Sequence, residues 1–227
     1  MSARKIQIFE LTLVTSVAFM NSIVLSFYVF FSNASIYKNL ENMVPHYLSA
    51  IGQDVVAMIF MFYVLYKQGK SYNSIGLRLP IQWMDILHAI GIIFFVYTVR
   101  SLITIPINSI APDFISQAAH PKNVEFLNTR FSYLLIILII TSPLKEELIV
   151  RGFAMTQIFD LTSKKYLAVT LSVIIQFSYH LYQGYASAIM SLPVFILFAL
   201  YFVKFSKLNP VKLAHKMIDL LYLIQKR

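Results

Sequence analysis

The sequence of 227 residues contains no cysteine, which excludes disulfide bonds, thiolate metal sites and cysteine nucleophiles. It also has few charges. Charged residues make up 13% of the chain, whereas a soluble domain carries about 25%, and hydrophobic residues make up 58%. This composition predicts a protein that lies in a lipid bilayer. The length suits a single transmembrane domain over residues 1–227 and leaves little room for a second domain.

Several motifs of soluble enzymes are missing as well. No Gly-x-Ser-x-Gly motif is present, so a serine nucleophile is unsupported. Gly69-Lys70-Ser71 lacks the upstream glycine of a phosphate-binding loop, which argues against ATP hydrolysis. The net charge of +9 comes from Lys and Arg residues that are scattered between apolar stretches and form no basic stripe. We therefore expect no nucleic acid as a partner and interpret the charge as a signal for membrane insertion.

Seven apolar stretches are expected to form membrane helices, since a helix needs about 20 residues to cross the hydrocarbon core. The predicted fold is an all-α, polytopic transmembrane helical bundle. The last of the seven stretches is short for a full span. The stretches are Leu11–Phe31, Tyr47–Tyr66, Ile86–Ile105, Phe131 to about Phe159, Tyr166 to about Tyr182, Ala186–Val203 and Val211–Ile224.

The basic residues lie mainly in alternate connections between these stretches. They occur before the first stretch and after the second, fourth and sixth, as at Lys67, Lys164 and Lys204. The other connections are poor in Lys and Arg. By the positive-inside rule, the basic connections face the cytoplasm. The sequence therefore predicts a multi-pass protein of the cell membrane with a cytoplasmic N-terminus.

The fourth stretch contains the richest group of charges, Lys145-Glu146-Glu147-Leu148-Ile149-Val150-Arg151. A charged side chain at the centre of a bilayer costs about 2.5 to 3.5 kcal/mol on insertion scales, so such residues usually face a bundle interior and have a function. In an α-helix, Glu147 and Arg151 lie on one face and can pair, whereas Glu146 points about 100° away. We therefore expect one acid to be structural and the other to be free to act as a general base.

Histidines follow in the later stretches. Glu146 lies roughly 13 residues before the connection between the fourth and fifth stretches and His180 roughly 14 after it, or about 20 Å along each helix, so they can meet at one level. His215 and Asp219 share one helical face, and Asp219 can accept a hydrogen bond from the ring. If the last element starts deep in the membrane, three elements bring polar groups to one point, as water activation and oxyanion stabilisation require.

Taken in order, these residues resemble the motifs of the CPBP family of intramembrane proteases, also called the CAAX protease and bacteriocin-processing family, or Abi. This family includes the eukaryotic enzyme that removes the last three residues of prenylated CAAX proteins. The segment Asn73–Arg78 also resembles a short Leu-Gly-Leu-Arg stretch of bacterial members. The resemblance places the protease core at about 131–225. The matching elements are Glu146-Glu147-x-x-x-Arg151, the membrane residue His180, and His215-x-x-x-Asp219.

The resemblance implies an intramembrane endopeptidase and a role for each motif. Glu146 and His180 would activate the attacking water. Glu147 and Arg151 would hold the site together. His215 and Asp219 would stabilise the oxyanion or orient the water. We favour glutamate catalysis without a cofactor because no His-Glu-x-x-His motif is present, although a divalent metal such as zinc fits the same side-chain types.

Two positions depart from the family pattern. The residue four before His180 is usually Phe, but here it is Gln176, with Phe177 after it. This departure puts the aromatic packing beside His180 in question. Asp219 occupies a position that is often Asn, and its negative charge favours a protonated His215 or a metal.

Two other functions are compatible with charges inside a membrane. One is a non-catalytic bacteriocin self-immunity or scaffold protein. The other is a small proton-coupled transporter, which inverted symmetry between the two halves would favour and which the sequence does not show. For the protease, the expected partners are the lipid bilayer and a peptide or protein substrate. A prenylated CAAX-type protein and a bacteriocin precursor are the candidate substrates.

Overall fold

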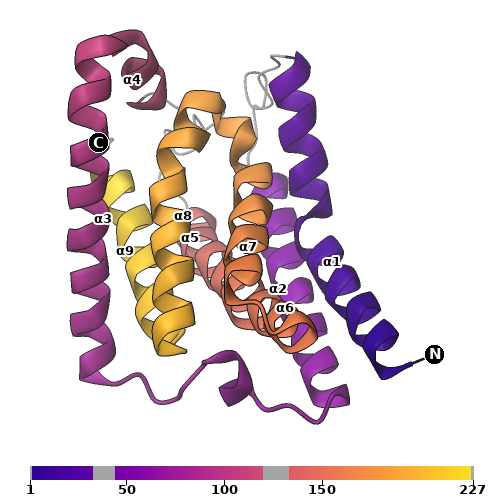
Figure 1. The fold of residues 1–227 in the computed structure, drawn as a ribbon. Coiled ribbons are helices and arrows are strands. Elements are labelled where there is room, and N and C mark those ends of the chain that lie inside the picture. Colours follow the sequence, from indigo (N-terminus) through magenta and orange to yellow (C-terminus); the bar gives the residue numbers. More distant parts are fainter. Residues whose placement is uncertain (1, 33–43, 120–132, 226–227) are drawn as a thin grey trace.

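The computed structural model describes residues 2–32, 44–119 and 133–225. Within these ranges the chain is helical and contains no β-strand, so the predicted all-α fold is confirmed (Figure 1). The elements are α1 (Ala3–Ser32), α2 (Val44–Lys67), η1 (Tyr72–Ile75), α3 (Trp83–Ile110), α4 (Pro112–Ala119), α5 (Tyr133–Glu146), η3 (Glu147–Met155), α6 (Thr156–Thr162), α7 (Lys165–His180), η4 (Leu181–Gln183), α8 (Tyr185–Phe205) and α9 (Asn209–Gln225).

The long helices correspond to the apolar stretches of the sequence. Four of them, α1, α2, α3 and α8, are long and apolar enough to cross a membrane. The fourth stretch forms one continuous rod of α5, η3 and α6, while α7 and α9 are shorter, with 16 and 17 residues. The short α4 was not expected. These helices make the chain a multi-pass membrane protein.

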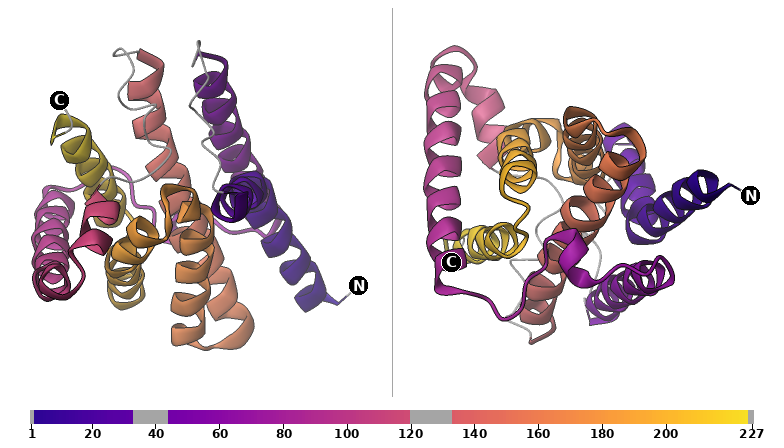
Figure 2. Two further views of the ribbon diagram at one scale, coloured as in Figure 1. Left: turned by 90° about the horizontal axis from the view of Figure 1, so that it is seen from above. Right: turned by 60° about the horizontal axis from the view of Figure 1, so that its bottom comes forward.

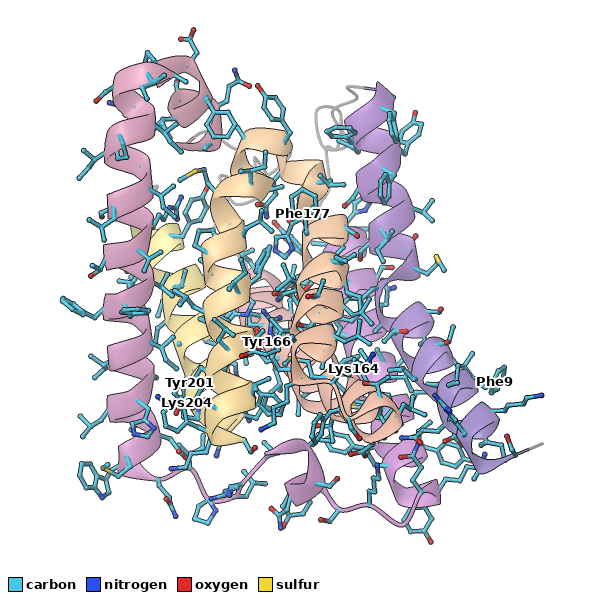
Figure 3. The ribbon with its side chains drawn as sticks, viewed as in Figure 1. Phe9, Lys164, Tyr166, Phe177, Tyr201 and Lys204 are labelled. Atoms are coloured by element: carbon cyan, nitrogen blue, oxygen red, sulfur yellow. The ribbon has the colours of Figure 1, made fainter. Side chains whose placement is uncertain are left out.

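The bundle has α3 at one edge and α1 at the opposite edge in every view (Figures 1 and 2). The connections that are rich in Lys and Arg lie at one end. The segment between α2 and α3 runs along the bottom of Figure 1, and the chain turns from α6 to α7 and from α8 to α9 towards the same end. Figure 3 labels Lys164, in the turn from α6 to α7, and Lys204, near the end of α8, in the lower half of the bundle. This shared end agrees with the alternation in the sequence, and the side of the membrane that it faces stays a prediction.

The rod changes its geometry at the charged motif. α5 ends at Glu146, and Glu147–Met155 form a π-helix, in which backbone hydrogen bonds span five residues instead of four. The sequence analysis assumed an α-helix here and was wrong, because hydrophobic periodicity does not signal this change. All nine residues of the π-helix are buried. A Cβ added at Gly152 would lie 3.2 Å from the Ile75 carbonyl oxygen, so the rod packs closely against η1.

The Asn73–Arg78 segment fixes the position at which α9 begins. The Leu208 backbone N–H donates to the Gly76 carbonyl oxygen at 2.9 Å. The Asn209 side-chain amide donates to the Arg78 carbonyl oxygen and, at 3.2 Å, to a carboxylate oxygen of Asp85 at the start of α3. These bonds place the first turn of α9, the helix that carries the last predicted motif.

Replacing Gly76 by Ala should destabilise the fold more than replacing Gly69 by Ala. Both glycines have a left-handed φ, +74° and +66°, which costs an L-residue about 1–2 kcal/mol. At Gly76 the new Cβ would also lie 2.8 Å from the Ser206 carbonyl oxygen and from a Phe202 ring carbon, whereas no atom lies within 4 Å at Gly69. Thermal unfolding in detergent should show a further loss of about 1–3 kcal/mol for Gly76→Ala. Equal losses would contradict the close contact.

Candidate active site

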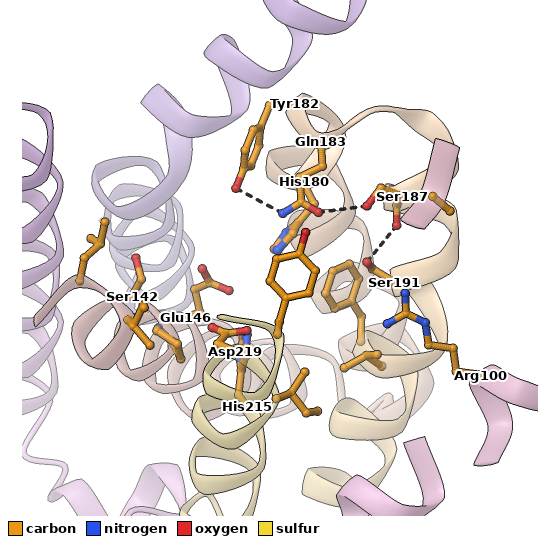
Figure 4. Close-up of a pocket in the computed structure, with 18 of the residues that line it drawn as sticks. Arg100, Ser142, Glu146, His180, Tyr182, Gln183, Ser187, Ser191, His215 and Asp219 are labelled. Atoms are coloured by element: carbon orange, nitrogen blue, oxygen red, sulfur yellow. Dashed lines mark hydrogen bonds and ion pairs between the residues drawn. The ribbon is translucent and has the colours of Figure 1, made fainter. Parts of the chain in front are cut away.

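A cavity of about 290 Å³ opens among α5, α7, α8 and α9 (Figure 4). Its lining includes Glu146 at the end of α5, His180 at the end of α7, and His215 and Asp219 from α9. Four of the six predicted site residues therefore meet at one cavity. The sequence left open whether the last element reaches this depth, and the structure places it there.

Glu146 is the acid of the motif that faces the cavity. Its side chain is half-buried, and its Oε2 accepts a hydrogen bond from the Tyr179 hydroxyl at 2.9 Å. Tyr179 is buried and stacks on Phe19 of α1, with 4.8 Å between ring centroids, so the position of its hydroxyl is well defined. No described residue donates a hydrogen bond to the other oxygen of Glu146, Oε1. That oxygen is available for a water molecule.

His180 is held at the C-terminal end of α7 by a backbone contact. Its Nδ1 lies 2.9 Å from the Gln176 carbonyl oxygen. Because a carbonyl oxygen only accepts, Nδ1 carries the proton of the neutral ring and Nε2 keeps its lone pair. The rings of Tyr179 and Phe195 pack beside the imidazole, with centroids at 4.7 and 4.8 Å. These two rings provide the aromatic packing that the glutamine at position 176 put in question.

Behind the cavity, Glu147 and Arg151 form an ion pair at the start of the π-helix. Arg151 Nε lies 3.4 Å from Glu147 Oε2, and both side chains are fully buried. The second carboxylate oxygen, Oε1, lies 2.8 Å from His215 Nδ1. The guanidinium also donates to the Gln176 side chain and, at 3.2 Å, to the Phe195 carbonyl oxygen. The predicted pairing of Glu147 with Arg151 is thus present, and it extends to α7, α8 and α9.

The ring of His215 is held by Glu147, whereas the sequence analysis assigned this contact to Asp219. Asp219 Oδ2 lies 3.8 Å from His215 Nε2, which is too far for a hydrogen bond. The prediction of a hydrogen bond between His215 and Asp219 was therefore wrong. Four-residue spacing puts both side chains on one helical face but does not determine their rotamers. The Asp219 side chain is 39% exposed and lines the cavity.

Lys145 pairs with Asp54 of α2, a contact that the sequence analysis did not identify. Lys145 Nζ lies 2.7 Å from Asp54 Oδ1, and both side chains are nearly buried. Asp54 Oδ2 accepts hydrogen bonds from the hydroxyls of Ser142 at 2.9 Å and Thr141 at 3.2 Å. This pair neutralises the lysine one residue before Glu146 and fixes α5 against α2. The available signal was a pair of opposite charges in two apolar stretches.

Other residues of the site were also missed by sequence reasoning. Tyr179 contacts a predicted residue directly, and so does Gln176, which the sequence analysis named only as a departure from the family pattern. Arg100 from α3 and Ser187 and Ser191 from α8 line the same cavity. Their signal in the sequence is weak, because tyrosine and serine are common in membrane helices and Arg100 stands near the end of its apolar stretch.

Comparison with known proteins agrees with the motifs. Residues 128–221 match the family model described as type II CAAX prenyl endopeptidase Rce1-like. The match covers somewhat less than half of the chain and includes all the predicted site residues. It supports assignment of the chain to the CAAX protease family. No curated protein and no solved structure matches the chain.

Replacing Arg151 by Met should destabilise the protein far more than replacing Lys70 by Met. Loss of Arg151 leaves the Glu147 carboxylate buried with one cation fewer, and breaking a buried pair costs about 3–5 kcal/mol. Lys70 pairs with Asp160 at the surface, at 2.6 Å, and exposed pairs contribute about 0–1 kcal/mol. Thermal unfolding in detergent measures both effects. Adding Glu147→Gln to Arg151→Met should restore part of the loss, and a double variant no more stable than the single one would contradict this explanation.

Proposed function

We propose that this chain, with its CAAX-protease-like core, is an intramembrane endopeptidase in which Glu146 and His180 activate a water molecule. The matching family is one of endopeptidases, which suggests a protease with a peptide or protein substrate. One observation carries the assignment of residues. Glu146 and His180, from different helices, line one cavity together with His215 and Asp219.

Glu146 is suited to act as the general base. Tyr179 holds its Oε2, and Oε1 has no donor among the described residues. The bond from His180 Nδ1 to the Gln176 carbonyl leaves Nε2 as an acceptor. A water molecule held between Glu146 Oε1 and His180 Nε2 would find an acceptor for each proton, with a lone pair left to attack a carbonyl carbon.

His215 is suited to stabilise the oxyanion. Glu147 holds its Nδ1, so a protonated ring has one further N–H, on Nε2. Nε2 is the nitrogen nearest to Asp219, a residue that lines the cavity. A donor that is already in place when charge develops on the substrate typically contributes about 10²–10³-fold in rate. Asp219 would orient this ring or the attacking water.

The proposed reaction consumes only water. The water oxygen attacks the carbonyl carbon of the scissile bond and gives one proton to Glu146. The carbonyl oxygen becomes an oxyanion, which accepts a hydrogen bond from His215. When the tetrahedral intermediate collapses, the C–N bond breaks and the proton passes from Glu146 to the leaving amine. Glu146 is then a carboxylate again, ready for the next turnover.

The cavity wall suggests which substrate to test first. Beside the polar centre, Leu135, Leu138 and Ile139 of α5 form an apolar wall. A peptide that carries an apolar group next to its scissile bond fits this combination. The prenylated CAAX-type substrate in the description of the matching family has this chemistry. A bacteriocin precursor is the second candidate. No observation favours the immunity, scaffold or transporter alternatives over a protease.

Replacing Glu146 by Gln, or His180 by Gln, should reduce peptide cleavage by about 10²–10⁴-fold, the usual contribution of a general base. The assay follows cleavage of a dansylated tetrapeptide with an S-farnesyl cysteine, two aliphatic residues and a methionine, by chromatography. Two variants outside the cavity serve as matched controls. Glu10 is a buried acid paired with Lys67, and His88 contacts Tyr201. Glu10→Gln and His88→Gln should keep activity in proportion to their folded fraction.

The same assay separates catalysis from binding. Full cleavage by folded Glu146→Gln would remove Glu146 as the base, and equal cleavage by all variants would attribute the activity to a contaminant. A wild-type protein that binds the peptide without cleaving it would favour a scaffold function. The melting temperature of each variant in detergent identifies losses that come from misfolding.

A chelator should leave cleavage unchanged if Glu146 and His180 act without a metal. In the described part of the chain, no three His, Cys, Asp or Glu side chains are grouped to hold an ion. The measurement compares cleavage before and after treatment with a chelator of divalent ions, followed by readdition of zinc. Loss on treatment with recovery on zinc would replace the glutamate mechanism with a metal-assisted one.

A further inference from the structure

We propose that Arg100 is the centre of a subsite that binds the terminal carboxylate of a peptide substrate. This subsite lies in the same cavity as Glu146 and His180. The inference rests on the proposed function, because it takes the occupant of the cavity to be a peptide. It adds a specificity determinant that lies on α3, outside the residues that match the family model.

Arg100 differs from Lys145 and Arg151, the two cations beside the proposed base. Lys145 is paired with Asp54, and Arg151 with Glu147. For Arg100, no carboxylate of the described residues lies within ion-pair distance, although it lines a cavity that also contains two acids. Arg100 is exposed and stands near the end of its apolar stretch, where a cation costs less than at the bilayer centre, so its place in the cavity is what singles it out. A guanidinium that lines a cavity and has no carboxylate partner among the described residues is a candidate anion-binding group.

The position of Arg100 gives the cavity two ends of opposite charge. Figure 4 shows Arg100 on the side of Ser187 and Ser191, and Glu146 on the other side. Among the described residues that line the cavity, Arg100 is the one Lys or Arg, while Glu146 and Asp219 are the acids. An anionic group would be repelled by the acids and attracted to Arg100. A peptide would therefore enter with its carboxylate toward α3 and an internal carbonyl toward Glu146.

The neighbouring polar groups suit a carboxylate. The Ser191 hydroxyl donates to the Ser187 carbonyl oxygen at 2.9 Å, and the Ser187 hydroxyl makes a long bond of 3.4 Å to Gln183 Oε1. A long bond is easily exchanged for one to a ligand. The planar guanidinium presents paired N–H groups that match the two oxygens of a carboxylate. A carboxylate held here would fix how far from the chain end the peptide bond is cut.

The experiment measures binding and cleavage separately. The probe is the same dansylated farnesyl tetrapeptide, with either a free or an amidated C-terminus, and binding is followed by fluorescence anisotropy in neutral detergent. Wild type should bind the free acid roughly 10- to 100-fold more tightly than the amide, the range of charge-assisted hydrogen bonds. Arg100→Gln should lose this preference, and Arg100→Lys should retain part of it. Arg78→Gln, which changes an exposed arginine outside the cavity, should behave as wild type.

Three outcomes would overturn the subsite. The first is that wild type and Arg100→Gln each bind the free acid and the amide with the same affinity. The second is that wild type shows no measurable binding of the free acid. Competition by an anionic phospholipid that depends on Arg100, without any effect of amidation, would assign the guanidinium to a lipid phosphate. In contrast, a preference for the free acid without cleavage of either peptide would uphold the subsite and reject the catalytic proposal.

Discussion

The site depends on one buried carboxylate, that of Glu147. Removing a carboxylate from water is unfavourable unless charges and hydrogen bonds compensate for the lost hydration. Here Arg151 compensates from the same helix and His215 from α9. The guanidinium in turn needs acceptors on α7 and α8. The network therefore holds α7, α8 and α9 against the π-helix, and the cavity lies among these helices and α5.

Local properties of the sequence were sufficient to predict the long helices and the pairing of Glu147 with Arg151, but not the short α4 or the π-helix. Apolar length defines a membrane helix, and four-residue spacing defines a helical face. Contacts between helices could not be predicted in this way. The pairing of Lys145 with Asp54 depends on α2 lying beside α5, and the rotamer of Asp219 depends on what already holds His215. The catalytic roles of the predicted site residues stay predictions.

The glutamine at position 176 shows how a departure from a motif can be accommodated. Its side chain accepts a hydrogen bond from Arg151, and its backbone carbonyl accepts one from His180. One residue thus connects the buried ion pair to the histidine that faces the cavity. Phe195 of α8 packs on the imidazole. The packing needed beside His180 is therefore present without a phenylalanine four residues earlier.

Three consecutive residues of the rod contact three different helices. Lys145 reaches α2, Glu146 reaches Tyr179 on α7, and Glu147 reaches α9. A rotation of the rod about its axis by a single residue would break all three contacts at once. The rod is thus locked in its angular register, and the two glutamates cannot exchange places. Any movement that admits a substrate must leave these three neighbours in position around the rod.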